Sequence, residues 1–395
     1  MMRVSALVLG LAAVMPAAAQ AQRPQWAPVL RGYFLNVPIA SAAGPFSDAV
    51  AADVQRLRLM ARSSYGPLSV DVAYEHVLTL RSEATVGLFA GLSPTGTGGD
   101  WLPLQGSLLQ KDHIDWQHRV DRASLAYGVG SAEATIGRQP ISWATTLFLT
   151  PADPFVPFDP SDPFREYRRG VDAVRLRGFP GAFSEIDLAF RVANTPIGRT
   201  VSAAGRGRAA VGAWEFLGWA GVVHDDPAVS VAATLSIGGA VLRTESVVRR
   251  ANDETVFRAT IGADRSFVVW DRNVYVVLEY QRDGFGAASG DDLIATLLSE
   301  PARRGELQVF GRDEVVVQGS LELHPLVNVS ALVIWNVNDP SALLGPAASY
   351  SAADEVAVRG GVYFGAGRGT TASGLLGSEF GAVPTTAYAS VTWFF

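Results

Sequence analysis

Hydrophobic and polar residues alternate along much of this chain with a period of two. The last ten residues show the pattern clearly: one face of an extended strand would carry Ala387, Ala389, Val391, Trp393 and Phe395, and the other Tyr388, Ser390, Thr392 and Phe394. Similar segments recur at 68–75, 186–192, 274–281, 315–323 and 327–336. Such alternation predicts β-strands whose two faces meet different environments. A tilted strand needs about ten residues to cross a membrane.

The pattern predicts about sixteen strands, with fourteen or eighteen as alternatives. They cover residues 29–36, 53–63, 67–78, 118–128, 131–138, 171–178, 184–193, 210–222, 227–238, 255–264, 272–282, 313–323, 327–336, 342–351, 355–365 and 386–395. Segment 342–351 contains Pro346, and it is kept because an even number of strands places both chain ends in the periplasm. The predicted fold is all-β: a transmembrane, antiparallel, up-and-down β-barrel.

The predicted connections alternate between short and long, as in outer-membrane barrels with periplasmic turns and external loops. The long ones cover residues 37–52, 79–117, 139–170, 194–209, 239–254, 283–312 and 366–385. The connection 337–341 should be external but is short. Residues 291–300, followed by Pro301, predict a short helix within one external loop.

Composition supports export and a membrane location. The 395 residues are 48% hydrophobic but only 18% charged, with a net charge of −6 and no cysteine. Arg3, an apolar run at 4–14 and the small-x-small site Ala19-Gln20-Ala21 predict a signal peptide over residues 1–21, and hence the general secretory route. An exported chain without an 18-residue apolar stretch spans a membrane only as a closed barrel, here residues 22–395. The alternative outside the membrane-protein class is a soluble secreted β-protein.

Charged residues within the strands are expected to line the lumen. A barrel of this size holds water, and an Arg facing lipid at mid-depth costs roughly 2–4 kcal/mol. The expected pore-lining residues are Arg56, Arg58, Arg62, Asp71, Glu75, Arg122, Glu133, Arg175, Arg177, Asp187, Arg191, Arg258, Glu279, Glu322 and Arg359. The first three form a basic ladder on one strand. Two interpretations stay open: the charges pair and stabilise the lining, or they select among passing solutes.

The connection 139–170 is predicted to fold into the barrel mouth. Five prolines within residues 151–163 exclude a strand or helix there, and a solvated loop would not be so rich in Phe. The expected constriction residues are Asp153, Phe155, Phe158, Asp159, Asp162, Arg165, Glu166, Arg168 and Arg169. The alternative is a packed surface loop that meets no solute.

Catalytic and cofactor chemistry finds no support in the sequence. Asp112-His113-x-Asp115-x-x-His118 fits no standard zinc spacing, and no motif joins a Ser and a His. The glycines at 205, 207, 365 and 367 do not lead a strand into a helix, so no nucleotide site is expected. Scattered arginines and an acidic net charge argue against nucleic-acid binding. We therefore predict no enzyme activity, no cofactor and no metal.

Several motifs resemble a family of porin-like bacterial outer-membrane barrels, related in style to alginate-export barrels. They are Gly137-Arg138-Gln139-x-Ile141-Ser142-Trp143, the Asp-Pro-rich loop, Arg169-Gly170-Val171-Asp172-Ala173, Glu279-Tyr280, and Ser378-Glu379-Phe380-Gly381. The sequence departs from the family at Ala144, where a Gly is usual. A strand ending in Trp393 and Phe395 is similar to the C-terminal insertion signal of such barrels. The resemblance implies an outer-membrane channel and names no solute.

The predicted function is passive diffusion of ions or small polar solutes across the outer membrane of a Gram-negative bacterium. The alternatives are an export or assembly barrel for polysaccharide or lipid that works with periplasmic partners, and a barrel enzyme. The expected partners are outer-membrane lipid, the barrel insertion machinery and small polar solutes. Self-association into a homo-oligomer stays open, because no interface signal is visible.

Overall fold

The chain folds into antiparallel strands joined in one continuous sheet. The computed structural model describes residues 28–82, 99–155, 164 and 167–395; the predicted signal peptide lies outside them. The strands are β1 (Val29–Ser41), β2 (Val50–Tyr65), β3 (Leu68–Arg81), β4 (Gln105–Lys111), β5 (Ile114–Val129), β6 (Ala132–Gln139), β7 (Val171–Gly181), β8 (Ser184–Thr195), β9 (Gly198–Val211), β10 (Trp214–Val223), β11 (Asp226–Ile237), β12 (Ala240–Ala251), β13 (Glu254–Val269), β14 (Arg272–Asp283), β15 (Asp313–His324), β16 (Val327–Asn336), β17 (Ser341–Ala353), β18 (Val356–Ala366) and β19 (Thr386–Phe394). After β14 come η2 (Gly290–Asp292), α1 (Leu293–Leu298) and α2 (Glu300–Arg303).

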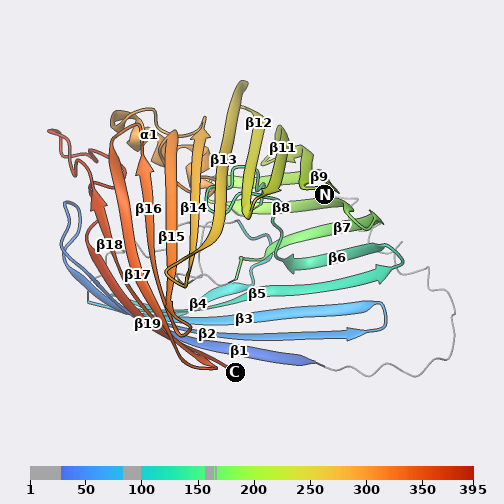
Figure 1. Cartoon of the computed structure of the whole chain (residues 1–395), viewed down its shortest axis with the longest axis horizontal. Coiled ribbons are helices and arrows are strands. Elements are labelled where there is room, and N and C mark those ends of the chain that lie inside the picture. Colours follow the sequence, from blue (N-terminus) through green and yellow to red (C-terminus); the bar gives the residue numbers. More distant parts are fainter. Residues whose placement is uncertain (1–27, 83–98, 156–163, 165–166) are drawn as a thin grey trace.

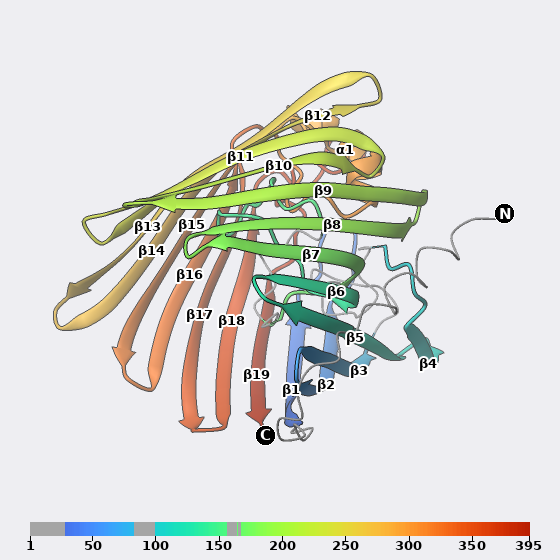
Figure 2. The same cartoon turned by 90° about the vertical axis from the view of Figure 1, so that its right-hand side faces the viewer.

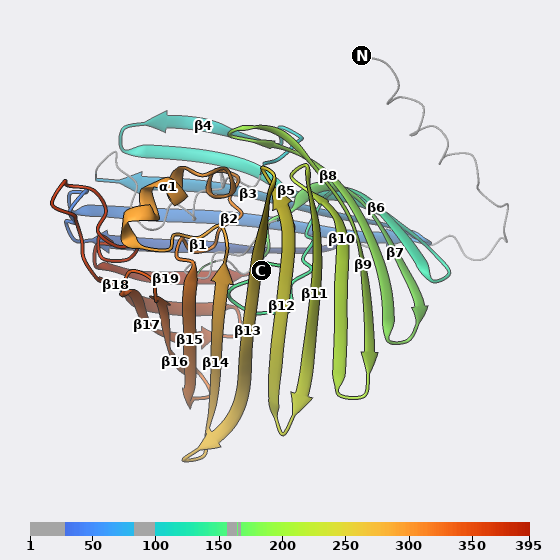
Figure 3. The same cartoon turned by 90° about the horizontal axis from the view of Figure 1, so that it is seen from above.

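Eighteen of these strands close a barrel. Each pairs antiparallel with its neighbours in chain order, β3 pairs directly with β5, and β1 pairs with β19. Within the described residues, β4 pairs only with β5 and stands outside this circuit. Figure 2 shows β19 beside β1, and Figure 3 shows β5 to β15 following one another around the barrel. Closure leaves the barrel without a free sheet edge.

The two ends of the barrel differ. The termini end carries the start of β1 and the end of β19, where the amide of Gly32 and the carbonyl of Phe395 lie 2.7 Å apart in a hydrogen bond. Its connections are tight turns. The opposite end, called the loop end, carries the longer connections, including the one that holds α1 (Figure 1). Across the described part of the chain, no helix is long and apolar enough to cross a membrane.

The outer surface is apolar and the inner surface is mixed. On β19, Val391, Trp393 and Phe395 are about half exposed, while Tyr388 and Ser390 are buried, as the alternation predicts. Exposed aromatic residues gather toward both ends of the wall. Those near the termini end include Phe183, Trp214, Phe216, Trp270, Tyr350 and Trp393, and those near the loop end include Trp116, Phe257, Tyr280, Trp335 and Phe364. An apolar band between aromatic girdles is the outer face of a transmembrane barrel.

Two hydrophobic clusters lie inside the barrel. The first joins inward residues of β1–β3 and β15–β19 to residues of the loops, among them Leu149, Phe164, Val309 and Phe380. The second packs Ile141, Trp143, Ala152 and Phe155 against β7, β8 and β10–β12. Loop segments therefore fill part of the interior.

The prediction of about sixteen strands is wrong, and eighteen is the alternative that holds. Segments 194–209 and 239–254 are not long external loops, because they form most of β9 and β12. In the middle of β9 the outward positions are Ala203, Gly205, Gly207 and Ala209, and such small residues produce no hydrophobic alternation. In β12 the charged inward residues masked the strand. At the loop end, β9 begins after the two-residue connection 196–197 and β12 ends at the two-residue connection 252–253, and 224–225 between β10 and β11 is equally short.

These short connections explain why the predicted alternation of loop lengths fails. At the loop end, residues 224–225 and 252–253 both have positive φ at the two central positions, as a type I′ hairpin turn requires. Such turns need no long loop. The weak strand 342–351 is confirmed as β17, where Pro346 lies at a gap in the ladder to β18. The predicted helix at 291–300 is present, divided between η2, α1 and α2.

Candidate functional site

The chain leaves the wall after Gln139, the last residue of β6, and a tightly packed glycine lies two residues before that point. Gly137 has φ +112°, and a Cβ there would lie 2.2 Å from the carbonyl oxygen of Ala123. The next residue, Arg138, donates from Nε and Nη2 to the two oxygens of Asp172, both at 2.8 Å. The two motifs at 137–143 and 169–173 therefore meet, one at the end of β6 and the other at the start of β7. Residues 140–170, described at 140–155, 164 and 167–170, are called the inward loop below.

Two carboxylates from the far wall bind the backbone of the inward loop. Glu279 on β14 accepts the N–H groups of Leu147, Phe148 and Leu149 at 2.6, 3.0 and 2.9 Å. Glu245 on β12 accepts the N–H groups of Thr145 and Ala152 at 2.8 and 3.0 Å. Both glutamates are buried. The two carboxylates thus pair backbone N–H groups of the loop inside the lumen. These hydrogen bonds fix the path of the loop.

Aromatic side chains fix the two ends of the described loop segment. The indole N–H of Trp143 donates to Asp187 on β8 at 2.8 Å, and that of Trp219 donates to the carbonyl of Ala152 at 2.9 Å. On the opposite side, the ring of Phe164 lies 5.0 Å from that of Tyr388 on β19. The inward loop therefore reaches from the β8–β12 side of the barrel to the β19 side.

The basic ladder on β2 lies on the inner face, and its middle residue, Arg58, forms ion pairs. Arg58 is buried and forms ion pairs with Glu75 on β3 and with Asp121 on β5, the latter at 2.7 Å. Arg56 is also buried. Arg62, nearer the termini end, is exposed and pairs with Asp71 at 2.8 Å. Tyr167 of the inward loop covers Arg58, with its ring centre 4.7 Å from the guanidinium carbon.

A β-bulge in β5 completes this cluster. The register to β3 shifts between Ala73 and Tyr74, so that Asp121 and Arg122 both turn into the lumen. Asp121 is buried against Arg58 and Arg119, while Arg122 lies 3.8 Å from Asp71. Period-two reasoning found Arg122 but missed Arg119 and Asp121, because a bulge puts neighbouring residues on the same face.

The other predicted lumen charges on β6–β8 and β13 are also compensated. Arg175 pairs with Asp187 at 2.6 Å, and Arg177 pairs with Glu133. Arg258 pairs with Asp283 at 2.7 Å. Arg191 donates to the carbonyl of Phe155 at 2.7 Å. These contacts favour the first of the two interpretations, in which the charges stabilise the lining. Glu322 and Arg359 lie apart from this network, near the termini end.

The predicted constriction residues are partly placed by the structure. Asp153 and Phe155 are buried, Arg168 pairs with Asp153, and Arg169 pairs with Asp100 at 2.8 Å. Burial raises the pKa of the Asp153 carboxyl to about 6, although the neighbouring Arg168 opposes this rise. Burial also lowers the pKa of Arg169. The remaining predicted residues, Phe158, Asp159, Asp162, Arg165 and Glu166, lie outside the described residues.

A segment of the preceding loop closes the wall where the inward loop leaves it. β6 ends at Gln139, and beyond it β5 pairs with β4 instead. The N–H groups of Trp101 and Leu102 donate to Asp172 at 2.9 and 2.8 Å, and Asp100 pairs with both Arg138 and Arg169. Sequence reasoning missed Asp100, Arg138 and Asp172 as a cluster, since they come from three separate elements.

Within the described ranges, no three His, Asp or Glu side chains are grouped as metal ligands. His118 instead lies near His76, with ring centres 6.3 Å apart, on the outer face of β3 and β5.

Comparison with known proteins finds similarity to solved structures but none to sequence families or curated sequences. No protein-family model matches the sequence, and a search of curated proteins finds no match. Among solved structures, the chain is similar to OccAB1 of Acinetobacter baumannii, with a TM-score of 0.59 and 10% identity over 93% of this chain and 96% of that one. It is similar to OccK2 (OpdF) of Pseudomonas aeruginosa, solved in complex with glucuronate, with a TM-score of 0.56 and 13% identity over 93% and 98%. A BenF-like porin from Pseudomonas fluorescens Pf-5 gives 0.56 and 12% over 93% and 98%. This chain therefore has the closed-barrel fold of outer-membrane porins.

Proposed function

We propose that this protein is an outer-membrane channel through which small polar solutes diffuse passively. One observation carries the proposal: a closed barrel of eighteen strands has an apolar outer face, while its interior is lined by charged and polar side chains around a loop bound to its walls. A barrel of this size leaves room for an aqueous path. The inward loop would then narrow that path, as the sequence predicted.

Similar folds support the class of solute. OccK2 was solved with glucuronate and OpdK of Pseudomonas aeruginosa with vanillate. Both ligands are small and polar. We extend to this chain only the general class, because the identities are low. We likewise propose that the pore-lining and constriction residues named above line the path of the solute.

The remaining sequence predictions fit this function. We propose that residues 1–21 are removed as a signal peptide after export by the general secretory route, and that residues 22–395 form the barrel. Trp393 and Phe395 would present the insertion signal to the barrel insertion machinery, with outer-membrane lipid around the apolar band. The likeness of the motifs at 137–143 and 169–173 to alginate-export-like porins gains support from their contact in the fold, because together they direct the chain into the lumen.

Single-channel recording in planar bilayers tests the proposal. The full-length mature chain is compared with a variant in which residues 151–164 are replaced by a short Gly-Ser linker. Stable ohmic openings in the native chain, and larger ones in the variant, are expected. If the native chain stays closed and only the variant opens, an export or assembly barrel with periplasmic partners is the better explanation. If neither conducts although both fold, the diffusion channel is wrong.

A further inference from the structure

The inner surface of the barrel is divided into two chemically different parts. The ion pairs described above lie on β2–β14. Toward the termini end, the inward positions of β15–β19 instead form a neutral wall, made of Gln318, Ser320, Asn328, Ser330, Ser349, Ser390 and Thr392. In these five fully described strands, that half of the inner face carries only Glu322 and Arg359 as charged residues. Glu322 accepts from Asn273 at 2.8 Å and so faces β14.

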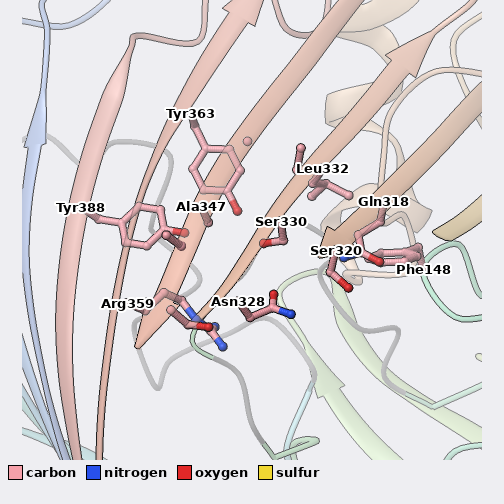
Figure 4. A pocket seen from close by; sticks show the side chains of 14 residues that line it. Phe148, Gln318, Ser320, Asn328, Ser330, Leu332, Ala347, Arg359, Tyr363 and Tyr388 are labelled. Atoms are coloured by element: carbon pink, nitrogen blue, oxygen red, sulfur yellow. The ribbon is translucent and has the colours of Figure 1, made fainter. Parts of the chain in front are cut away.

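A cavity of about 400 Å³ lies against this neutral wall. Its lining combines hydroxyl and amide side chains with three aromatic rings, those of Phe148, Tyr363 and Tyr388. Figure 4 shows the two tyrosines and Arg359 on one side, Gln318, Ser320 and Phe148 on the other, and Asn328 and Ser330 between them. The volume falls within the ~300–1,000 Å³ range of small-molecule sites, which combine apolar surface with a few polar groups that fix orientation.

The position of Phe148 connects the cavity to the constriction. Phe148 belongs to the inward loop, its N–H donates to Glu279 at 3.0 Å, and its carbonyl accepts from Gln308 at 2.6 Å. A solute in the cavity would therefore touch the loop that narrows the lumen. Most of the wall residues that line the cavity lie on the termini-end halves of β15–β19, so a solute that enters from the loop end would pass the inward loop on its way to the cavity.

We propose that this cavity is a binding subsite for small, uncharged, polyhydroxylated solutes of monosaccharide size. The inference rests on the proposed channel function and names its solute class. Serine hydroxyls and the amides of Gln318 and Asn328 can both donate and accept, which suits solute hydroxyl groups. The aromatic rings offer apolar faces for the C–H side of a sugar ring. Arg359 can donate to a hydroxyl oxygen as well.

The charge distribution favours a neutral solute over an anion. On the opposite wall, Arg58, Arg175 and Arg258 already have carboxylate partners. These arginines do not line the cavity, where Arg359 is the one charged side chain among the described residues of the lining, so a solute carboxylate would lose its water on entering with a single cation to face. A neutral polyol needs only hydrogen-bonding groups, which the neutral wall supplies.

Current block in planar bilayers tests the solute class. Glucose, glucuronate and glucosamine share one ring and differ in charge, and each is added on the external side. Glucose is expected to interrupt the current at a concentration several-fold lower than either charged sugar. A lower blocking concentration for glucuronate would overturn the proposal, because Arg359 would then dominate recognition.

A double variant tests the location. Asn328→Leu with Ser330→Ala nearly keeps the side-chain shapes but removes two sets of polar groups, so the half-blocking concentration of glucose should rise about tenfold. The control is Val329→Leu, which changes the outward face of the same strand and should leave the block unchanged. Equal block in all three proteins would overturn the site.

A binding measurement separates failure of the subsite from failure of the channel. Saturation-transfer NMR on the folded protein in lipid nanodiscs detects glucose without any need for conduction. Binding that the double variant loses, in a protein that does not conduct, would keep the subsite and refute the diffusion channel. Conduction without glucose binding would refute the subsite alone.

Discussion

Loss of the Glu279 charge is expected to release the inward loop while the barrel stays folded. The carboxylate accepts three backbone N–H groups, of Leu147, Phe148 and Leu149, within 3.0 Å. In Glu279→Gln, one oxygen becomes an NH₂ group that cannot accept, so at least one buried N–H loses its partner. The backbone pairing of β14 with β13 and β15 does not involve this side chain.

The size of the effect follows from the bonds that change. A hydrogen bond to a charged group contributes about 1.5–3 kcal/mol, and a neutral one about 0.5–1.5 kcal/mol. Losing one bond and the charge on the other two should therefore weaken loop docking by about 4 kcal/mol. Since 1.4 kcal/mol corresponds to a factor of ten, the ratio of released to docked loops should rise about a thousandfold.

Single-channel recordings should show the change directly. In Glu279→Gln, a second and larger conductance level should appear far more often than in the native channel. The matched control is Glu322→Gln, which removes the same charge from the lumen face but contacts Asn273 instead of the inward loop. If the two variants give the same traces, loop anchoring by Glu279 is refuted and only lumen charge matters.

Three further predictions test other contacts. Gly137→Ala should reduce the folded fraction, measured by heat-dependent electrophoretic mobility, because the new Cβ would lie 2.2 Å from the carbonyl oxygen of Ala123. The control Gly178→Ala should fold normally, since nothing lies within 4 Å of its Cβ position. Equal folding of the two variants would contradict the close approach at Gly137. Asp172→Asn should speed proteolysis at residues 99–104, because it weakens the bonds to Arg138 and to the Trp101 and Leu102 amides, while Asp253→Asn, in an exposed pair, should not. Burial raises the pKa of Asp153 to about 6, against about 3.9 when solvated, so docking of the inward loop binds a proton, and the docked loop loses stability as pH rises from about 4 through 6. Larger openings should therefore be rarer at pH 5 than at pH 7.5. If Asp153→Asn keeps the pH dependence of the native channel, another group is responsible for it.

The sequence by itself determined the faces of individual strands. In 386–395, period-two alternation separated Val391 and Trp393 from Tyr388 and Ser390, and the structure places the first two on the outer face and the other two on the inner face. It also predicted that the connection 139–170, which lies between the motifs at 137–143 and 169–173, folds into the barrel mouth. These features are local: a strand between lipid and lumen shows its two environments in its own residues.

Strand number and charge pairing depended on tertiary structure. The middle of β9 has only small outward residues, so its pattern predicts a loop, and the hydrogen-bonded neighbours β8 and β10 identify it as part of the wall. Arg58 forms an ion pair with Asp121, which lies 63 residues away along the chain, beside a bulge that puts both Asp121 and Arg122 on the inner face. Glu279 meets the inward loop at a separation of about 130 residues. Closure of the barrel decides which strands become neighbours and which walls face each other, and that information is not carried by any single segment.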